Sequence, residues 1–113
     1  MKLCKVVAIF DELKLQAVEQ ALLRHGIDGF TIHPVSGRGR YFDSFNENRL
    51  IKHIQIEIYA REQDAPTIRN CIVDAAHSNT ESEGLVSIMP INDLYWIHDK
   101  RSALKADFQC RES

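Results

Sequence analysis

Residues 50–60, LIKHIQIEIYA, alternate between apolar and polar side chains. The apolar positions Ile54, Ile56 and Ile58 fall on one side of an extended chain, and the polar positions fall on the other: His53, Gln55, Glu57 and Tyr59. This period of two predicts a β-strand with one buried face. It also favours an antiparallel sheet whose polar face is open to solvent or to a partner subunit.

Four more segments predict strands. Residues 4–10 form a short run rich in β-branched side chains, typical of a central strand buried on both faces. Residues 28–35 predict a second strand and residues 85–91 a fourth, with the 50–60 strand between them. Residues 93–98 indicate a short fifth strand or a strand–turn element.

Two amphipathic helices separate these strands. The first is predicted over 12–25, with Asp11 as its N-cap, Gly26 as its left-handed exit and an apolar stripe at Leu15, Val18, Leu22 and His25. The second is predicted over 65–78, with Asp64 as its cap, Pro66 in its first turn and a stripe at Ile68, Ile72 and Ala76. The order β-α-β-β-α-β is that of α+β ferredoxin-like domains, whose helices cover one face of an antiparallel sheet. The other face then needs a cover, and we expect oligomerisation to supply it.

Bulk properties narrow the function. The chain has 113 residues, which fits one domain, and its net charge of −2 disfavours nucleic acid as a partner. It has no apolar run of the ~20 residues that a membrane span needs, and its N-terminus indicates a first strand rather than a signal peptide. Three widely spaced cysteines form neither a zinc pattern nor a disulfide framework, which favours the cytoplasm.

The segment between the second and third strands is too long and too polar for a hairpin turn. Its root reads Gly37-Arg38-Gly39-Arg40. Two glycines allow the backbone to approach a ligand closely, so Arg40 is interpreted as an anion-binding residue. Arg38 and Arg49 are interpreted as solvated charges, and the glycines taken alone would more often be plain turn residues.

The whole pattern resembles PII-type signal-transduction proteins over residues 2–98, most specifically in the first forty residues. The likeness is carried by Ala8-Ile9 ending the first strand, Lys14-Leu15, Ala21-Leu22, Gly26-Ile27-x-Gly29-x-Thr31 and Gly37-x-Gly39-Arg40. It implies a PII-like domain over 1–98 with a long T-loop at about 37–52, and a tail over 99–113. It further implies a homotrimer that binds adenine nucleotides in the clefts between subunits. Such proteins contact a target protein, here unknown, through the T-loop.

The resemblance also assigns a ligand site, position by position. Gly37, Gly39 and Arg40 would hold a phosphate, and the purine would lie against Ile9, Thr31, Glu57 and Tyr59. Gly84 remains from the family's B-loop, but both of its lysines are missing. Tyr41 and His53 replace a glutamine and a lysine that contact magnesium or 2-oxoglutarate, and Trp96 and His98 replace two arginines. The absence of a charge-assisted hydrogen bond costs ~1.5–3 kcal/mol of binding free energy.

These replacements disfavour MgATP with 2-oxoglutarate. PII-like relatives with a modified phosphate region favour AMP or ADP and sense bicarbonate, so the resemblance implies AMP or ADP here. A small planar anion such as bicarbonate would suit a site containing Arg40, Tyr41 and His53. Two alternatives stay open: an interaction trimer that has lost nucleotide binding, and a metal-handling trimer that uses His33 and His53. For those two histidines, a pair of surface side chains is the simpler interpretation. No firm metal site is expected.

Catalysis is not supported by any motif, because the sequence has no Ser-His-Asp, HExxH or P-loop pattern. Tyr95 and Trp96 are interpreted as interface packing, with stacking on a nucleotide as the alternative. Cys4 and Cys71 are interpreted as small core residues. Cys110, in the polar tail, is the cysteine whose position best suits redox chemistry, although an inert thiol is the simpler interpretation.

Overall fold

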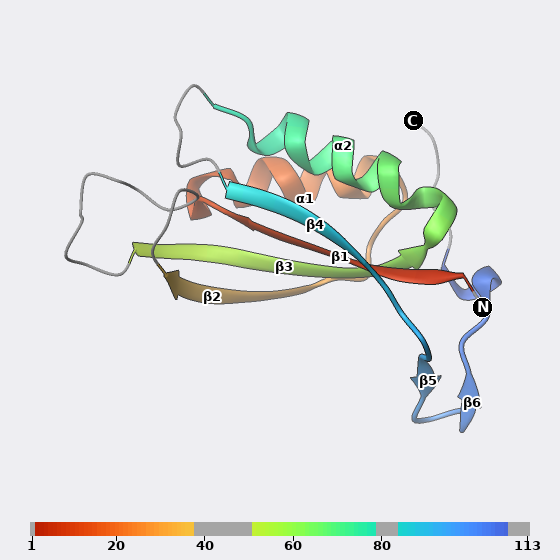
Figure 1. Cartoon of the computed structure of the whole chain (residues 1–113). Helices are drawn as coiled ribbons and strands as arrows, with labels where there is room; N and C mark the ends of the chain where they lie inside the picture. Colours follow the sequence, from red (N-terminus) through yellow and green to blue (C-terminus); the bar gives the residue numbers. More distant parts are fainter. Residues whose placement is uncertain (1, 38–50, 79–83, 109–113) are drawn as a thin grey trace.

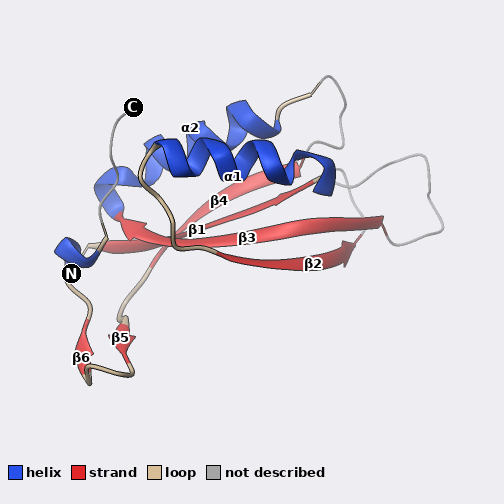
Figure 2. Cartoon of the chain, turned by 180° about the vertical axis from the view of Figure 1, so that it is seen from behind, coloured by secondary structure: helices blue, strands red, loops and turns tan. Residues whose placement is uncertain are grey.

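A computed structural model describes residues 2–37, 51–78 and 84–108 of the chain. Four antiparallel strands form a sheet in the order β2-β3-β1-β4, and both helices lie on one face of it (Figures 1 and 2). The strands are β1 (Leu3–Phe10), β2 (Thr31–Gly37), β3 (Ile51–Arg61) and β4 (Gly84–Pro90), and the helices are α1 (Leu15–Arg24) and α2 (Ala65–Ala76). The ferredoxin-like arrangement is therefore confirmed.

The core lies between the sheet and the two helices. The predicted inward positions of β3, Ile54, Ile56 and Ile58, are all buried. The helices contribute Val18, Leu22, Ile68 and Ile72, each at most 1% exposed. Burying an aliphatic side chain of this size contributes ~1.5–3 kcal/mol, so this layer supplies most of the driving force for folding. Among the described residues, neither helix has the length and apolarity needed to cross a membrane.

The chain leaves α1 through a glycine, as the sequence predicts. Gly26 has a φ of 78°, a left-handed conformation that suits glycine. Its N–H donates to the carbonyl of Leu23, and the N–H of Ile27 donates to the carbonyl of Leu22. These two bonds are a Schellman motif, and Ile27 is buried beside Leu22. The following residues connect to β2, which starts at Thr31 rather than at the predicted residue 28.

The two helices begin differently from one another. The Asp11 carboxylate accepts from the N–H of Leu13, so the predicted cap is confirmed, although it opens a 3-10 turn over Glu12–Lys14 before α1 begins. Asp64 is the N-cap residue of α2, as predicted, but its side chain makes no capping hydrogen bond: its carboxylate accepts from Arg61 Nε at 2.6 Å instead. A second 3-10 turn, Glu62–Asp64, occupies that position, and a guanidinium within reach is a stronger donor than a backbone N–H. Pro66 lies in the first turn, as predicted.

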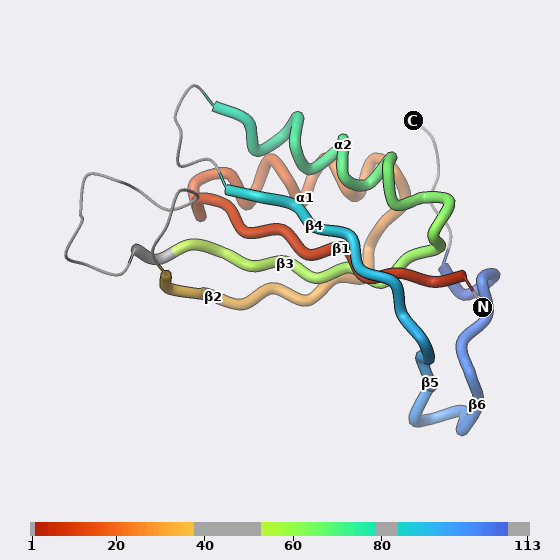
Figure 3. Tube along the Cα trace, in the orientation of Figure 1, coloured from red at the N-terminus to blue at the C-terminus, as the bar shows by residue number. Residues whose placement is uncertain are grey.

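After β4 the chain forms a small hairpin on the side of the sheet opposite the helices (Figure 3). Strand β5 (Tyr95–Trp96) pairs with β6 (Arg101–Ser102), and a 3-10 turn, Lys105–Asp107, follows. The N–H of Ala103 donates to the carbonyl of Leu94 at 2.7 Å, and Ala103 is 1% exposed. The predicted fifth strand thus exists only as two residues, which are paired with residues of the predicted tail.

Candidate functional site

One group of the predicted ligand residues lies at a single end of the sheet. Strands β1 and β2 run towards this end, while β3 and β4 start there, so Ile9, Gly37, His53 and Gly84 lie at or near it (Figure 1). The strand order places Gly37 and Gly84 on opposite edge strands. The predicted residues Gly39, Arg40 and Tyr41 lie outside the described residues.

A second group lies further along the sheet. Thr31 pairs with Glu57 in the β2–β3 register, and Tyr59 follows on the same face two residues later. Thr31 and Gly37 are six positions apart on one strand, which is about 20 Å at the usual rise. His98 lies in the exposed turn between β5 and β6, away from the first group (Figure 1). Ile9 joins the two groups, because its register partner Gln55 lies two residues from Glu57 on the same face of β3. Thr31 and Gly37, by contrast, stay far apart on β2.

At the first end, Ile9 and Gly84 are in direct contact. Gly84 has a φ of 117°, and a Cβ placed on it would lie 1.9 Å from the carbonyl oxygen of Ile9. Only glycine fits this position, so the fold alone explains Gly84. The presence of glycine at position 84 therefore follows from backbone packing and does not by itself indicate a ligand.

The same end contains an apolar pocket of about 360 Å³, part of it open to solvent. Its lining comes from the ends of β1 and α2 and the start of β4: Ile9, Phe10, Ile72, Val73, Ala76, His77, Gly84, Leu85 and Val86. Leu85 stands where the resemblance expects one of the missing lysines. The described lining suits a flat apolar group and supplies no lysine or arginine for a phosphate.

A larger pocket, about 620 Å³, lies beside the second group. Tyr59 and Trp96 line it together with the loop that follows α1, and the remaining lining residues are Gly26, Ile27, Asp28, Gly29, Ile58, Ala60, Asp64, Ile68, Asp107 and Phe108. Tyr59 is 44% exposed on the open face of the sheet. Sequence reasoning found Tyr59 but missed the contribution of Asp107 and Phe108, because nothing in the spacing of a polar tail shows where it folds back.

Trp96 has its own partners within the chain. Its ring stacks on Phe108 with centroids 5.7 Å apart and planes at 17°, and its Nε1 donates to Asp107 at 3.0 Å. Trp96 is predicted to pack at a subunit interface; in the structure it packs against Phe108 and Asp107 of its own chain, which the sequence did not predict. The ring nevertheless remains at the edge of the larger pocket.

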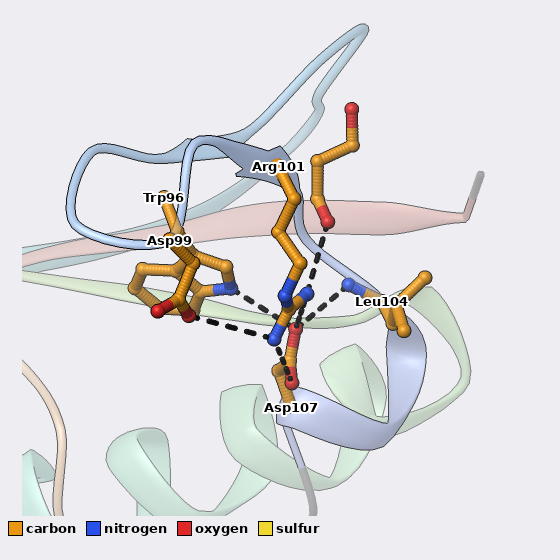
Figure 4. A network of polar contacts seen from close by, with 6 residues as sticks. Trp96, Asp99, Arg101, Leu104 and Asp107 are labelled. Carbon is orange, nitrogen blue, oxygen red and sulfur yellow. Dashed lines mark hydrogen bonds and ion pairs between the residues drawn. The ribbon is translucent and has the colours of Figure 1, made fainter.

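Asp107 is the centre of a polar network that ties the tail to the hairpin (Figure 4). Arg101 donates to both carboxylate oxygens, at 3.1 and 3.3 Å, and the N–H of Leu104 donates at 2.8 Å. The Arg101 bonds, then those from Leu104 and Trp96, hold the pKa of Asp107 well below its ordinary value of 3.8. Asp107 in turn raises the pKa of Arg101. Neither helix nor strand periodicity predicts a contact between Arg101 and Asp107, which are six positions apart, so the sequence alone did not indicate it.

Glu57, a predicted purine contact, is held in place on the open face. Lys5 Nζ lies 3.1 Å from its Oε1, and Gln55 Nε2 donates to the same oxygen at 3.4 Å. The side chains of Lys5 and Glu57 are 29% and 23% exposed. A ligand that uses this carboxylate would therefore share it with a lysine.

The expected pair of surface histidines is wrong in one member. His33 is exposed, but His53 is only 4% exposed, because alternation reports which face a side chain occupies and not what packs over that face. In the register, His33 pairs with Gln55 and His53 with Val35. Within the described ranges, no three His, Cys, Asp or Glu side chains are grouped so that they could hold a metal ion.

Comparison with known proteins identifies the family. Residues 3–101 match the model of the family described as nitrogen regulatory protein P-II. The chain is 26% identical to a P-II homolog of Arabidopsis thaliana; the match covers 94% of this chain and 58% of that protein. It is 29% identical to P-II 2 of Methanothermobacter thermautotrophicus, and this match covers 90% of this chain and 95% of that protein. It is 32% identical to the P-II protein of Pyropia yezoensis over 77% of its length, covering 84% of that protein.

A solved structure agrees with these matches. The crystal structure of Arabidopsis thaliana PII bound to citrate superposes with a TM-score of 0.78 at 27% identity, covering 93% of this chain and 92% of that one. The shared fold thus extends over nearly the whole of both chains. The chain belongs to the nitrogen regulatory protein P-II family.

Proposed function

We propose that this P-II regulatory protein is a cytoplasmic homotrimer that binds AMP or ADP between subunits and controls a target protein through residues 37–52. The observation that carries the proposal is that Thr31 and Gly37, which are predicted to contact the purine and the phosphate, lie about 20 Å apart along β2. A mononucleotide that contacts both of these residues needs one of them from each of two copies. A site within one copy would use only one of them.

The open face of the sheet supports assembly. Lys5, Val7 and Ile9 of β1 lie on it, opposite the helices, beside Leu85 and Met89 of β4, which are 37% and 40% exposed. Large apolar side chains on an uncovered sheet face favour burial against another copy. Glu57 and Tyr59 share this face, so assembly would bring them next to a second chain.

The chemistry of the described pocket supports a nucleotide with a short phosphate chain. The pocket at the first end, where the phosphate is predicted to bind, has an apolar described lining without a lysine or arginine. The replacement of a lysine by Leu85 removes a cation that a triphosphate would need. Arg40 would supply the remaining positive charge, and a bicarbonate ion near Arg40, Tyr41 and His53 is the second ligand that we propose. The Arabidopsis relative was solved bound to citrate, which is also an anion with carboxylate oxygens.

The proposal is tested by titration calorimetry of the purified protein with AMP, ADP and ATP, each with and without bicarbonate. Native mass spectrometry of the same sample gives the number of subunits. We expect a trimer, binding of AMP or ADP that is tighter than binding of ATP, and a further change with bicarbonate. A monomer, or the absence of heat with all three nucleotides, contradicts the proposal.

Two arginine variants locate the anion site. Arg40→Ala should weaken nucleotide binding by about 1.5–3 kcal/mol, roughly ten- to a hundredfold, without dissociating the trimer. Arg38→Ala is the matched control, because Arg38 is expected to be a solvated charge, and its affinity should stay within about twofold. Equal effects of the two changes would mean that general charge, rather than a site at Arg40, holds the ligand.

A trimer that has lost nucleotide binding is the second candidate, and the replacement at Leu85 favours it. A thermal-shift series with the three nucleotides separates the two candidates, because a ligand that binds only the folded state raises its melting temperature. A midpoint that none of them moves would support the interaction trimer.

A further inference from the structure

A thiol and an imidazole meet between the two helices, away from every predicted ligand residue. Cys71 lies in α2, and His25 follows the last residue of α1. Their Sγ and Nδ1 atoms are 3.6 Å apart, although 46 residues separate them in the chain. The two helices lie side by side on the covered face of the sheet (Figure 2). The pair is thus a product of helix packing.

The neighbouring backbone indicates where the imidazole carries its proton. Nδ1 of His25 lies 3.0 Å from the carbonyl oxygen of Ala21, and a carbonyl oxygen can only accept. Nδ1 must therefore be the donor in that bond. Nδ1 has one hydrogen, so the carbonyl at 3.0 Å and the Cys71 sulfur at 3.6 Å share it, and the sulfur is the second acceptor. A shared donor at this distance still favours the thiolate, the nucleophilic form of cysteine, over the thiol.

Cys71 has a route to solvent. It is 8% exposed and lines an open pocket of about 470 Å³ with Ala21, Arg24, His25, Asp74 and Ala75. Arg24 and Asp74 bring one charge of each sign to this pocket, so it repels neither neutral nor singly charged reagents. The pocket lies on the helix side, so a second copy on the open face of the sheet would leave it accessible.

Cys4 offers a contrast within the same chain. It is 1% exposed, and its Sγ donates to the carbonyl of Arg61 at 3.8 Å. Burial, followed by the negative charges of Glu62 and Asp64, raises the pKa of the Cys4 thiol. Its environment therefore disfavours the thiolate, whereas the geometry around Cys71 favours it.

We propose that Cys71 and His25 form a reactive thiol pair, a modification site for hydroperoxides and other small electrophiles. With a hydroperoxide, the Cys71 thiolate attacks one peroxide oxygen, so that an S–O bond forms as the O–O bond breaks. Sulfur is oxidised by two electrons to a sulfenic acid. The leaving hydroxide or alkoxide takes the proton that the thiol gave up and departs as water or an alcohol. This site is independent of nucleotide binding.

The test uses the full chain carrying Cys110→Ser, so that only Cys4 and Cys71 report. The folded protein is treated with iodoacetamide, and alkylation of each cysteine is followed by mass spectrometry. A parallel sample receives hydrogen peroxide and a sulfenic-acid probe. We expect Cys71 to be alkylated at least about tenfold faster than Cys4 and to be the residue that carries the probe. Similar rates for the two cysteines, or no sulfenic acid at Cys71, would overturn the proposal.

Variants of His25 separate activation from simple exposure. His25→Leu removes the donor and should slow the alkylation of Cys71 about three- to tenfold, which corresponds to the loss of one hydrogen bond. His25→Gln keeps an N–H donor and should retain part of the rate, while His33→Gln, on β2, should change nothing. Cys4 reports on folding in each variant, because global opening would accelerate it as well. An unchanged Cys71 rate in His25→Leu with a slow Cys4 refutes the role of His25. If His25→Leu opens the fold, the alkylation rate of Cys71 in His25→Gln decides. A Cys71 that is alkylated no faster than Cys4 in that variant refutes the role of the N–H donor.

Discussion

Lys5 Nζ lies 3.1 Å from Glu57 Oε1 and joins β1 to β3 across the face of the sheet that no helix covers. The two residues are not directly opposite in the register; Lys5 pairs with Tyr59, and Glu57 pairs with Val7. The contact is therefore diagonal, which long side chains can span. It places a fixed pair of charges at the centre of the surface that we propose another copy covers.

A double-mutant cycle with Lys5→Met and Glu57→Gln should measure a weak interaction. Both side chains are more than a fifth exposed, and pairs of this kind contribute about 0.2–1 kcal/mol. Urea unfolding of the four proteins gives the coupling energy, and the same series in high salt should reduce it because ions screen the pair. A coupling of several kcal/mol would mean that the pair is desolvated by assembly.

Gly84→Ala should destabilise the protein by at least about 2 kcal/mol, because the added methyl meets a backbone oxygen and the residue keeps a φ of 117°. The matched control is Gly29→Ala, since a Cβ at Gly29 has no atom within 4 Å. That change should stay within about 0.5 kcal/mol. Denaturant unfolding without nucleotide measures both. A Gly84→Ala protein of normal stability would show that β4 can move away from Ile9.

Ile68→Ala should cost about 2–5 kcal/mol of unfolding free energy, because Ile68 is 1% exposed in the layer between α2 and the sheet. Val73→Ala on the same helix is the control: Val73 is 47% exposed, and its loss should change stability by less than about 0.5 kcal/mol. Equal losses would contradict the placement of the core on the Ile68 side of α2. Thermal unfolding followed by circular dichroism suffices for the comparison.

Acid should release the C-terminal tail from the hairpin. The pKa of Asp107 is lowered in the folded protein, so the carboxylate stabilises the folded tail above its ordinary value of 3.8. This contribution is lost as the pH falls below 3.8 towards the folded pKa. Trp96 is the one tryptophan of the chain and donates to Asp107, so its fluorescence should shift to longer wavelength over that range.

Two variants check the origin of that shift. Asp107→Asn removes the charge that Arg101 and Leu104 share, so its fluorescence at neutral pH should already resemble that of the acidified protein. Asp99→Asn is the control, since Asp99 lies 3.8 Å from Arg101 and contributes less. An acid shift that persists unchanged in Asp107→Asn would assign the transition to another group.

Local patterns in the sequence predicted the elements well because they arise from neighbouring residues. The alternation at Ile54, Ile56 and Ile58 placed the buried face of β3, and Gly26 located the end of α1 through its left-handed backbone. The errors occurred where a long-range partner intervened or a neighbour competed. Asp64 has the residue type of a cap but its carboxylate binds Arg61 instead, and His53 has the polarity of a surface residue but is only 4% exposed.

The sequence by itself determined the order of strands and helices, the family and the residue types available to a ligand. Only the tertiary structure decided which of these residues lie together: Thr31 and Gly37 share a strand yet stay about 20 Å apart, whereas His25 and Cys71 meet across two helices. Periodicity reports which face a side chain occupies, since it depends on backbone geometry alone. Contacts between distant segments depend on register and helix packing, which no local pattern encodes.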